Sequence, residues 1–136
     1  NSIWALGSAS IKEIEKLNIL NASLLAMSRA VKKLKVKPHL VLFDGNRSPK
    51  LKSYNTQTVI KGDQKIKEIS AASIIAKVSR DKLIFKMSKN FKKYKWDLNS
   101  GYGTRDHIAA IKKYGITKYH RKTFSPIHYI LSLQKK

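Results

Sequence analysis

Two aspartates follow short strand-like runs of the sequence, a position in which carboxylates can bind a catalytic metal ion. Asp44 follows the apolar run Leu40–Phe43, and Asp63 follows a second short run, Thr58–Gly62. In open α/β sheets the ligand crevice lies outside the carboxyl ends of the strands, so the sequence predicts that the two carboxylates face one another across such a crevice. An ordinary turn is an equally good interpretation of either aspartate, since Asp44-Gly45-Asn46 is also a common turn sequence.

A pair of strand-end carboxylates is suited to Mg²⁺, which is usually held by one or two carboxylates together with substrate phosphates. Two metal ions roughly 3.5 to 4 Å apart would stabilise the attacking and leaving oxygens of a phosphodiester displacement. Such a pair normally needs three or four carboxylates. Asp81, beside Arg80, favours a helix-surface ion pair, while Glu13 and Glu15 belong to a helix start, where acids offset the helix dipole. The predicted metal site is therefore half complete.

Composition points to a polyanionic partner. The chain has 136 residues, 29 Lys and Arg against eight Asp and Glu, and a net charge of +21. Nucleic acid is the simplest partner for such a charge, and its binding would depend on salt. A general preference for lysine would produce the same excess. No segment pairs a basic face with a wide exposed apolar one, which disfavours a membrane surface.

The remaining composition sets the class of protein. With 42% hydrophobic residues, the chain can form one domain, or part of one, around a modest core. It contains neither an apolar run of roughly 18 to 20 residues nor a signal-peptide pattern at its start, so we expect a cytoplasmic protein. The absence of cysteine excludes disulfides and thiolate metal sites.

The order of predicted elements is that of an α/β protein. Residues Ile3–Ala9 read as a short strand with a buried Trp4. The capping box Ser10-Ile11-Lys12-Glu13 opens a long helix whose apolar residues recur at helical spacing as far as Leu34. Pro38 follows that helix and leads to the strand at Leu40.

The second half is predicted to be mainly helical. A helix from Glu68 to about Phe91 opens on small residues and carries a basic face. A loop containing Trp96 follows, and Thr104 then caps a short helix that ends at Gly115. The last ten residues form a strand or a helix, and the pattern does not decide between them.

Aromatic and basic residues in the second half could contact nucleic acid. Tyr102 lies between two glycines and could stack on a base or a sugar, and packing of a turn tyrosine on the helix below is an equal alternative. His107 and His120 have no close metal-ligand spacing. We interpret them as structural or phosphate-facing groups rather than zinc ligands.

Six ordered blocks together resemble bacterial ribonuclease HII, the type 2 ribonuclease H, over nearly the whole chain. One is the helical segment Ser10–Met27, and another is Ile69–Asp81. The others are the motifs Asp44-Gly45-Asn46-Arg47-Ser48-Pro49-Lys50, Lys61-Gly62-Asp63, Gly101-Tyr102-Gly103-Thr104 through His107, and His120-Arg121-Lys122-Thr123-Phe124-Ser125-Pro126.

The resemblance implies a site and a fold. Asp44 and Asp63 would be catalytic carboxylates that ligate Mg²⁺ or Mn²⁺, and Tyr102 would stack on the sugar beside the RNA-to-DNA junction. Residues 1–94 would form a partial ribonuclease H-like core with a mixed sheet and flanking helices, and residues 95–136 a helical, substrate-binding extension of the same domain. Further substrate-binding residues would be Asn18, Lys77, Arg80 and Arg121.

One family motif does not occur in the 136 residues. Family members carry an Asp-Glu-x-Gly-Arg-Gly segment on the first strand, which supplies two more carboxylates and senses the ribose 2′-hydroxyl. A smaller departure is Glu15, where the family usually has Asp. Without the first strand, Leu40–Phe43 would be an unprotected apolar edge. We expect these residues alone to be inactive, marginally stable and prone to self-association.

The resemblance implies an endonuclease that cuts 5′ to ribonucleotides in RNA–DNA hybrids or in DNA duplexes with embedded ribonucleotides, and a monomer when complete. Two alternatives remain open: a non-catalytic basic RNA-binding protein, and a degenerate family member that lost its first strand. The gene sequence upstream of Asn1 separates a longer protein from a real loss.

Overall fold

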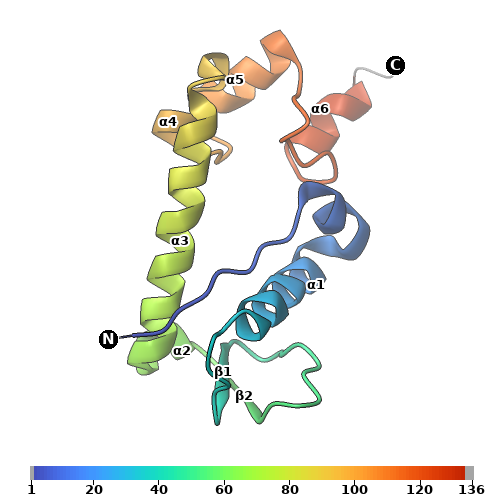
Figure 1. Ribbon diagram of the computed structural model, residues 1–136. Helices are drawn as coiled ribbons and strands as arrows, with labels where there is room; N and C mark the ends of the chain where they lie inside the picture. Colours follow the sequence, from blue (N-terminus) through green and yellow to red (C-terminus); the bar gives the residue numbers. More distant parts are fainter. Residues whose placement is uncertain (1, 134–136) are drawn as a thin grey trace. The chain divides into compact units, whose positions relative to one another are not determined.

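A computed structural model describes residues 2–133. The chain divides into two compact units, Asn1–Lys77 and Val78–Lys136. In the described residues of the first unit, strands β1 (Val41–Asp44) and β2 (Thr56–Val59) form a parallel two-stranded sheet (Figure 1). Asp44 pairs with Val59 in the sheet register, so the carboxyl ends of the two strands meet at one edge. The prediction of an α/β fold is confirmed.

Helix α1 (Ile11–Lys32) begins at the predicted capping box. The Ser10 amide donates to Glu13 Oε2 over 2.8 Å, and the Glu13 amide donates to Ser10 Oγ over 3.3 Å. The prediction of an uninterrupted helix is wrong at Asn18, whose φ of 66° and ψ of 170° break the helical path. The Asn18 carboxamide oxygen accepts the Asn21 amide at 3.0 Å and so caps the next segment.

The strand predicted at Ile3–Ala9 is wrong, because this segment lies extended along α1 without strand pairing. Arg29 donates to the Ser8 carbonyl over 2.8 Å, and Lys33 donates to the Leu6 carbonyl over 3.2 Å. A Cβ at Gly7 would lie 1.9 Å from the Ala26 oxygen, so only glycine permits this approach. Side-chain bonds to α1 thus replace the ladder that a strand requires.

Trp4 was predicted to be buried, and it is 60% exposed. The small core of the first unit lies elsewhere, where α1 packs on the sheet. Its buried residues are Val31, Phe43 and Leu51. Because Phe43 is 4% exposed while Leu40 is 44% exposed, the predicted apolar edge is only partly exposed. Within residues 2–133, β2 is the strand that pairs with β1.

Two helices follow the sheet. Helix α2 (Gly62–Lys65) is a single turn, and α3 (Lys67–Ser88) is long and belongs partly to each unit. Helix α3 ends three residues before the predicted Phe91. Several of its apolar side chains are exposed, and Ile74, Val78 and Leu83 are 60%, 44% and 59% exposed. No helix among the described residues is long and apolar enough to cross a membrane.

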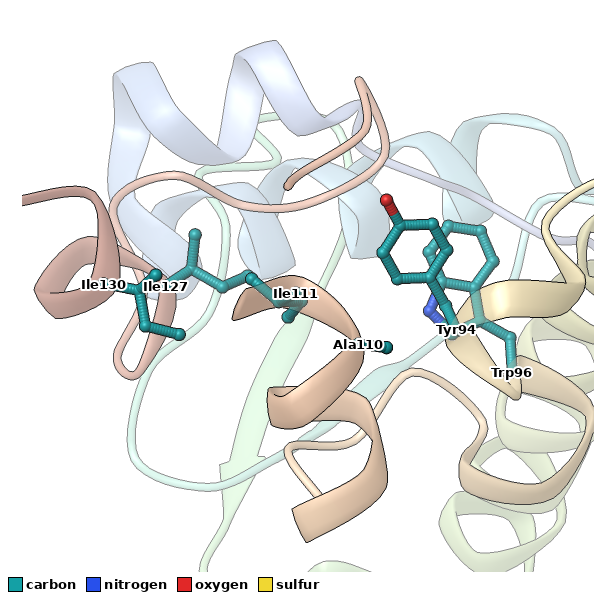
Figure 2. Close-up of a cluster of buried hydrophobic side chains, with 6 residues drawn as sticks. All are labelled: Tyr94, Trp96, Ala110, Ile111, Ile127 and Ile130. Atoms are coloured by element: carbon teal, nitrogen blue, oxygen red, sulfur yellow. The ribbon is translucent and has the colours of Figure 1, made fainter. Parts of the chain in front are cut away.

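The second unit is built around an aromatic and aliphatic core (Figure 2). It contains the 3₁₀ turn η1 (Lys92–Tyr94) and helices α4 (Trp96–Asn99), α5 (Arg105–Tyr114) and α6 (Ile127–Leu133). Figure 2 shows the rings of Tyr94 and Trp96 lying side by side near Ala110, with Ile111, Ile127 and Ile130 gathered further along the core. The predicted loop at Trp96 is therefore helical and buried. Of the undecided last ten residues, Ile127–Leu133 are a helix and 134–136 lie outside the described residues.

Helix α5 has the predicted bounds, since the sequence signals at both of its ends are strong. The Thr104 hydroxyl accepts the His107 amide at 3.3 Å and caps the first turn. Gly115 follows the last turn with a φ of 77°, and its amide donates to the Ile111 carbonyl over 2.9 Å. The position of the N-cap fixes which α5 side chains face the core.

Candidate functional site

The structure joins the two segments that carry the predicted metal ligands. Asp44 is the last residue of β1, as predicted, and its Oδ1 accepts the backbone amide of Gly62 at 2.8 Å. Gly62 immediately precedes Asp63, so one hydrogen bond links the loop holding the second carboxylate to the end of the strand holding the first. Both carboxylates are exposed. We refer to Asp44, Gly62 and Asp63 as the carboxylate site.

Asp63 lies somewhat differently from the sequence prediction. Strand β2 ends at Val59, and Asp63 falls four residues later in the single turn of α2. The prediction that it follows a strand directly is wrong, because the chain turns at Lys61, whose φ is 55°. Asp63 then lies in the first turn of α2, where a negative charge is favoured by the unpaired backbone amides.

Gly62 fits closely into this packing. A Cβ at position 62 would lie 2.6 Å from Ile69 Cδ1, 3.3 Å from Val59 Cβ and 3.4 Å from Asp44 Oδ1. The missing side chain lets the backbone approach the Asp44 carboxylate closely enough to donate to it. Sequence reasoning did not single out Gly62 as a partner of Asp44, and the signal was its place directly before the suspected ligand Asp63.

The donor chemistry of the carboxylate site fits a hard divalent cation in part. Exposed carboxylate oxygens are the ligands that Mg²⁺ and Mn²⁺ prefer, and one or two of them suffice when substrate phosphates complete the coordination. No group of three or more His, Asp or Glu residues close enough to hold a metal occurs within the described part of the chain. Asp44 and Asp63 would therefore be the protein ligands that residues 2–133 supply.

A second cluster of predicted residues lies within the second unit. The guanidinium of Arg80 lies 4.9 Å from the centre of the Tyr102 ring, and Tyr102 is 60% exposed. Arg80 also donates to Asp81 Oδ1 over 3.0 Å, which confirms the predicted ion pair. Arg121 stacks 3.9 Å from the centre of the Phe124 ring. Arg80, Tyr102 and Arg121 form what we call the arginine–tyrosine cluster.

The two arginines of this cluster repel each other. Burial lowers the pKa of Arg121 from its ordinary value, and the positive charge of Arg80 lowers it further. The second unit thus holds two guanidinium groups near enough to interact, and Asp81 is paired with one of them, Arg80. A bound phosphate would relieve the repulsion, and planar guanidinium groups bind phosphate oxygens in a bidentate manner.

Beneath Tyr102 lies a buried network that the sequence did not reveal. Trp96 Nε1 donates to His107 Nε2 over 3.0 Å, and His107 Nδ1 lies 2.8 Å from the Tyr102 carbonyl oxygen. His120 Nε2 lies 3.2 Å from His107 Nε2, and His120 Nδ1 accepts the Thr117 amide at 2.9 Å. We call these residues the histidine network. Both histidines are buried, which fits the structural alternative of the prediction better than the phosphate-facing one, and His107 contacts the Tyr102 backbone.

Burial changes the acid–base properties of this network. The pKa of His120 falls from 6.5 to about 4, mainly because burial disfavours the charged imidazolium and secondly because His107 lies beside it. Burial also raises the pKa of Tyr94, whose ring centre lies 4.9 Å from that of His120. One signal could have located His107: with Thr104 as N-cap, His107, Ala110 and Ile111 fall on one face of α5.

The last two predicted substrate-binding residues, Asn18 and Lys77, belong to the first unit. Asn18 is exposed at the kink of α1, where its carboxamide oxygen is used as a cap. Lys77 is exposed on α3. Within that unit, neither residue makes a described contact with Asp44 or Asp63.

Comparison with known proteins gives a consistent picture. A family model described as Ribonuclease HII matches residues 5–130. A ribonuclease HII of Pelagibacter ubique is 71% identical over 131 residues, which are 96% of this chain and 70% of that protein. A ribonuclease HII of Nitrosospira multiformis is 47% identical over 132 residues, which are 97% of this chain and 66% of that protein.

A solved structure supports the fold. The crystal structure of ribonuclease H2 from Pyrococcus horikoshii matches with a TM-score of 0.74 and 26% sequence identity, over 93% of this chain and 67% of that one. The chain thus spans about two thirds of the length of these relatives. Together the family match, the identities and the shared fold show that this chain belongs to the ribonuclease HII family.

Proposed function

We propose that the chain forms a large part of a metal-dependent type 2 ribonuclease H. The complete enzyme hydrolyses the phosphodiester 5′ to a ribonucleotide in RNA–DNA hybrids, or in DNA duplexes with embedded ribonucleotides, and leaves 3′-hydroxyl and 5′-phosphate ends. It would remove RNA in the cytoplasm during replication and repair. Family membership supports the class of reaction, and the bond between Asp44 and the Gly62 amide supports the place of the chemistry.

The carboxylate site would bind Mg²⁺ or Mn²⁺ through Asp44 and Asp63. When bound, such an ion lowers the pKa of a coordinated water and stabilises the leaving oxygen of the phosphodiester. Asp44 is held at the end of β1 by the Gly62 amide, so its carboxylate is oriented before a ligand arrives. The hydrogen bond also keeps the Asp63 segment against the strand end.

The other predicted residues would bind the nucleic acid. The exposed ring of Tyr102 would stack on a sugar next to the scissile phosphate, and the guanidiniums of Arg80 and Arg121 would bind phosphate oxygens. Lys77 would add a further positive charge, and Asn18 would donate from its amide group. Since Tyr102 and Arg121 both lie in residues 95–136, we propose that this segment is the substrate-binding extension.

We further propose that the 136 residues do not hydrolyse a hybrid by themselves. A two-metal displacement normally uses three or four carboxylates, and residues 2–133 bring no three metal ligands together. Exposed apolar side chains also favour self-association, among them Trp4, Ile60, Ile74 and Phe85, which are 55–64% exposed. Cleavage of a hybrid by these residues alone, with contaminating nucleases excluded, would refute the proposal. Sedimentation at increasing concentration tests self-association.

The test of the reaction uses a complete enzyme. Residues 1–136 replace the matching segment of the Pelagibacter ubique relative, with which they share 71% identity. We expect this chimera to cleave a duplex containing one ribonucleotide and to leave an all-DNA duplex intact. Asp44→Asn should remove most of the activity while hybrid binding persists, whereas Asp97→Asn, at an exposed carboxylate on α4, should retain it.

The same variants separate this function from non-catalytic RNA binding, which the net charge alone would favour. If the chain were a non-catalytic RNA-binding protein, Asp63→Asn would leave both RNA binding and the response to Mg²⁺ unchanged. Near-normal turnover of the Asp44→Asn chimera would contradict the assignment of the carboxylate site.

A further inference from the structure

The donors around the histidine network fix where the imidazole protons lie, and the single lone pair of His107 Nε2 is shared between two N–H donors, Trp96 Nε1 at 3.0 Å and His120 Nε2 at 3.2 Å. Trp96 Nε1 can only donate, so His107 Nε2 must accept, and the His107 proton then resides on Nδ1 and is donated to the Tyr102 carbonyl. His120 Nδ1 accepts the Thr117 amide, so its proton resides on Nε2 and is donated to His107 Nε2. Both imidazoles are neutral in this arrangement.

The network is buried and fully paired, so the ring orientations are fixed. Trp96, His107 and His120 are each 4% exposed. Among the described residues, no buried side-chain nitrogen or oxygen lacks a hydrogen-bond partner. The Trp96 and His120 ring centres lie 5.3 Å apart, so the hydrogen bonds are enclosed by aromatic packing. A buried network in which every member is satisfied holds its groups rigidly.

What this network holds is the backbone of Tyr102. The neighbouring Gly101 has a φ of 76°, and Gly103 adds no side chain. The Tyr102 amide donates to the Asn99 carbonyl over 2.8 Å, and the Tyr102 carbonyl accepts the Thr104 amide at 2.9 Å. His107 is the side chain that bonds the same carbonyl, at 2.8 Å, and it does so from the buried side. The backbone is therefore fixed from below while the ring remains exposed.

The histidine network is also connected to Arg121 of the arginine–tyrosine cluster. His120 immediately precedes Arg121, and the bond between His107 and His120 joins the Tyr102 turn to the segment that carries Arg121. Neither histidine side chain is exposed enough to touch a nucleic acid. Any influence on substrate must pass through Tyr102 and Arg121.

We propose that His107 and His120 are positioning residues for nucleic-acid binding, which set the affinity for an RNA–DNA hybrid by fixing the Tyr102 backbone and the start of the Arg121 segment. The inference rests on the proposed function, since it takes Tyr102 and Arg121 to contact the hybrid. A purely structural pair of core histidines would stabilise the second unit without acting through Tyr102.

The test is a double-mutant cycle measured on the 136-residue chain. Affinity for a fluorescein-labelled RNA–DNA hybrid is measured by anisotropy at one fixed salt concentration, and circular dichroism checks folding. His107→Phe retains an aromatic ring and removes the donor, whereas His107→Asn keeps an N–H near the position of Nδ1. We expect Tyr102→Ala to weaken binding about tenfold, as loss of one stacking contact does.

We expect His107→Phe to weaken binding several-fold, about three- to tenfold, and His107→Asn to restore most of it. In the Tyr102→Ala background, His107→Phe should have no further effect, because the group through which it acts is gone. An equal loss from His107→Phe in both backgrounds, or no loss with Tyr102 intact, would overturn the inference.

A measurement without nucleic acid separates the inference from the proposed function. If Tyr102→Ala leaves hybrid binding unchanged, the stacking role in the proposed function fails, and the positioning role in binding fails with it. If Tyr102→Ala weakens binding, the carbonyl ¹³C chemical shift of Tyr102 should move in His107→Phe and return in His107→Asn. An unchanged shift in His107→Phe would overturn the inference, because the bond from His107 Nδ1 to the Tyr102 carbonyl is then absent without effect on that carbonyl.

Discussion

The carboxylate site and the histidine network differ in how fully protein atoms satisfy them. Asp44 accepts one backbone amide and is exposed with Asp63, so a cation and its phosphate can still reach both. His107 and His120 have a protein partner for every ring nitrogen and lie under an aromatic core. A site that must bind a ligand keeps its oxygen atoms exposed to solvent. A network that must hold a side-chain ring in one orientation gives each of its ring nitrogens a hydrogen-bond partner within the protein.

The largest expected difference in mutational effect between the two units concerns their tryptophans. Trp96 is 4% exposed and belongs to the network, while Trp4 is 60% exposed. Trp96→Ala should lower the free energy of unfolding by about 3 to 5 kcal/mol, as truncation of a buried aromatic does. Trp4→Ala should change it by less than about 0.5 kcal/mol. Urea unfolding followed by circular dichroism measures both, and similar losses would erase the contrast.

The pH dependence of stability should come first from the histidine network. The pKa of His120 is lowered from 6.5 to about 4, so between these values the unfolded chain binds a proton that the folded chain does not. The free energy of unfolding should therefore fall as the pH falls from 6.5 towards 4, by up to about 1.4 kcal/mol per pH unit. Above pH 6.5 this contribution is constant.

We assign the fall in the free energy of unfolding between pH 6.5 and 4.5 to His120, after considering the groups that face it. His107 and Thr117 bond to it, the Tyr94 ring packs on it, and Arg121 follows it in the chain. The pKa of Glu13 is lowered from 4.5 to about 2, chiefly by its bond to Arg29, so its contribution is lost only below pH 4.5. His120→Phe should flatten the curve between pH 6.5 and 4.5, and an unchanged slope would contradict the role of His120.

Gly62→Ala tests the packing of the carboxylate site. Since the added Cβ would lie 2.6 Å from Ile69 Cδ1, we expect a loss of about 1 to 3 kcal/mol in the free energy of unfolding. The same change should weaken divalent metal binding, because it pushes the backbone away from Asp44. Gly103→Ala is the matched control: the nearest atom to its Cβ is Pro126 Cδ at 3.7 Å, an ordinary contact. Equal stability of the two variants would argue against the close approach.

The smallest expected effect concerns the capping box of α1. Ser10→Ala removes the hydroxyl that accepts the Glu13 amide at 3.3 Å, and it should cost about 1 kcal/mol of unfolding free energy. Ser53→Ala, at an exposed turn, should be neutral within about 0.5 kcal/mol. Thermal unfolding of both variants checks the difference.

Local signals predicted the elements whose determinants lie within a few residues. The Ser10 and Thr104 caps, the glycine after α5 and the strand ending at Asp44 were all predicted from their own sequences and are confirmed. Family membership was likewise predicted from ordered motifs and is confirmed by the relatives.

The structural features that the sequence did not predict mostly depend on contacts between residues distant in the chain. Ile3–Ala9 has the composition of a strand, yet a strand needs a neighbour, and this segment lies along α1 instead. The kink at Asn18 depends on a left-handed backbone that asparagine tolerates but does not require. The contact of His107 with His120 joins residues 13 positions apart, on a helix and in a turn, at a spacing that no local rule predicts.

The carboxylate site is the central claim, and the binding of Mn²⁺ to the 136-residue chain, followed by electron paramagnetic resonance of the free ion, tests it most directly. We expect Asp44→Asn and Asp63→Asn each to lower the affinity at least about tenfold, because each removes one of two hard oxygen ligands. Asp97→Asn, at an exposed aspartate outside the site, should leave the affinity unchanged. Equal binding by all three variants would contradict the account.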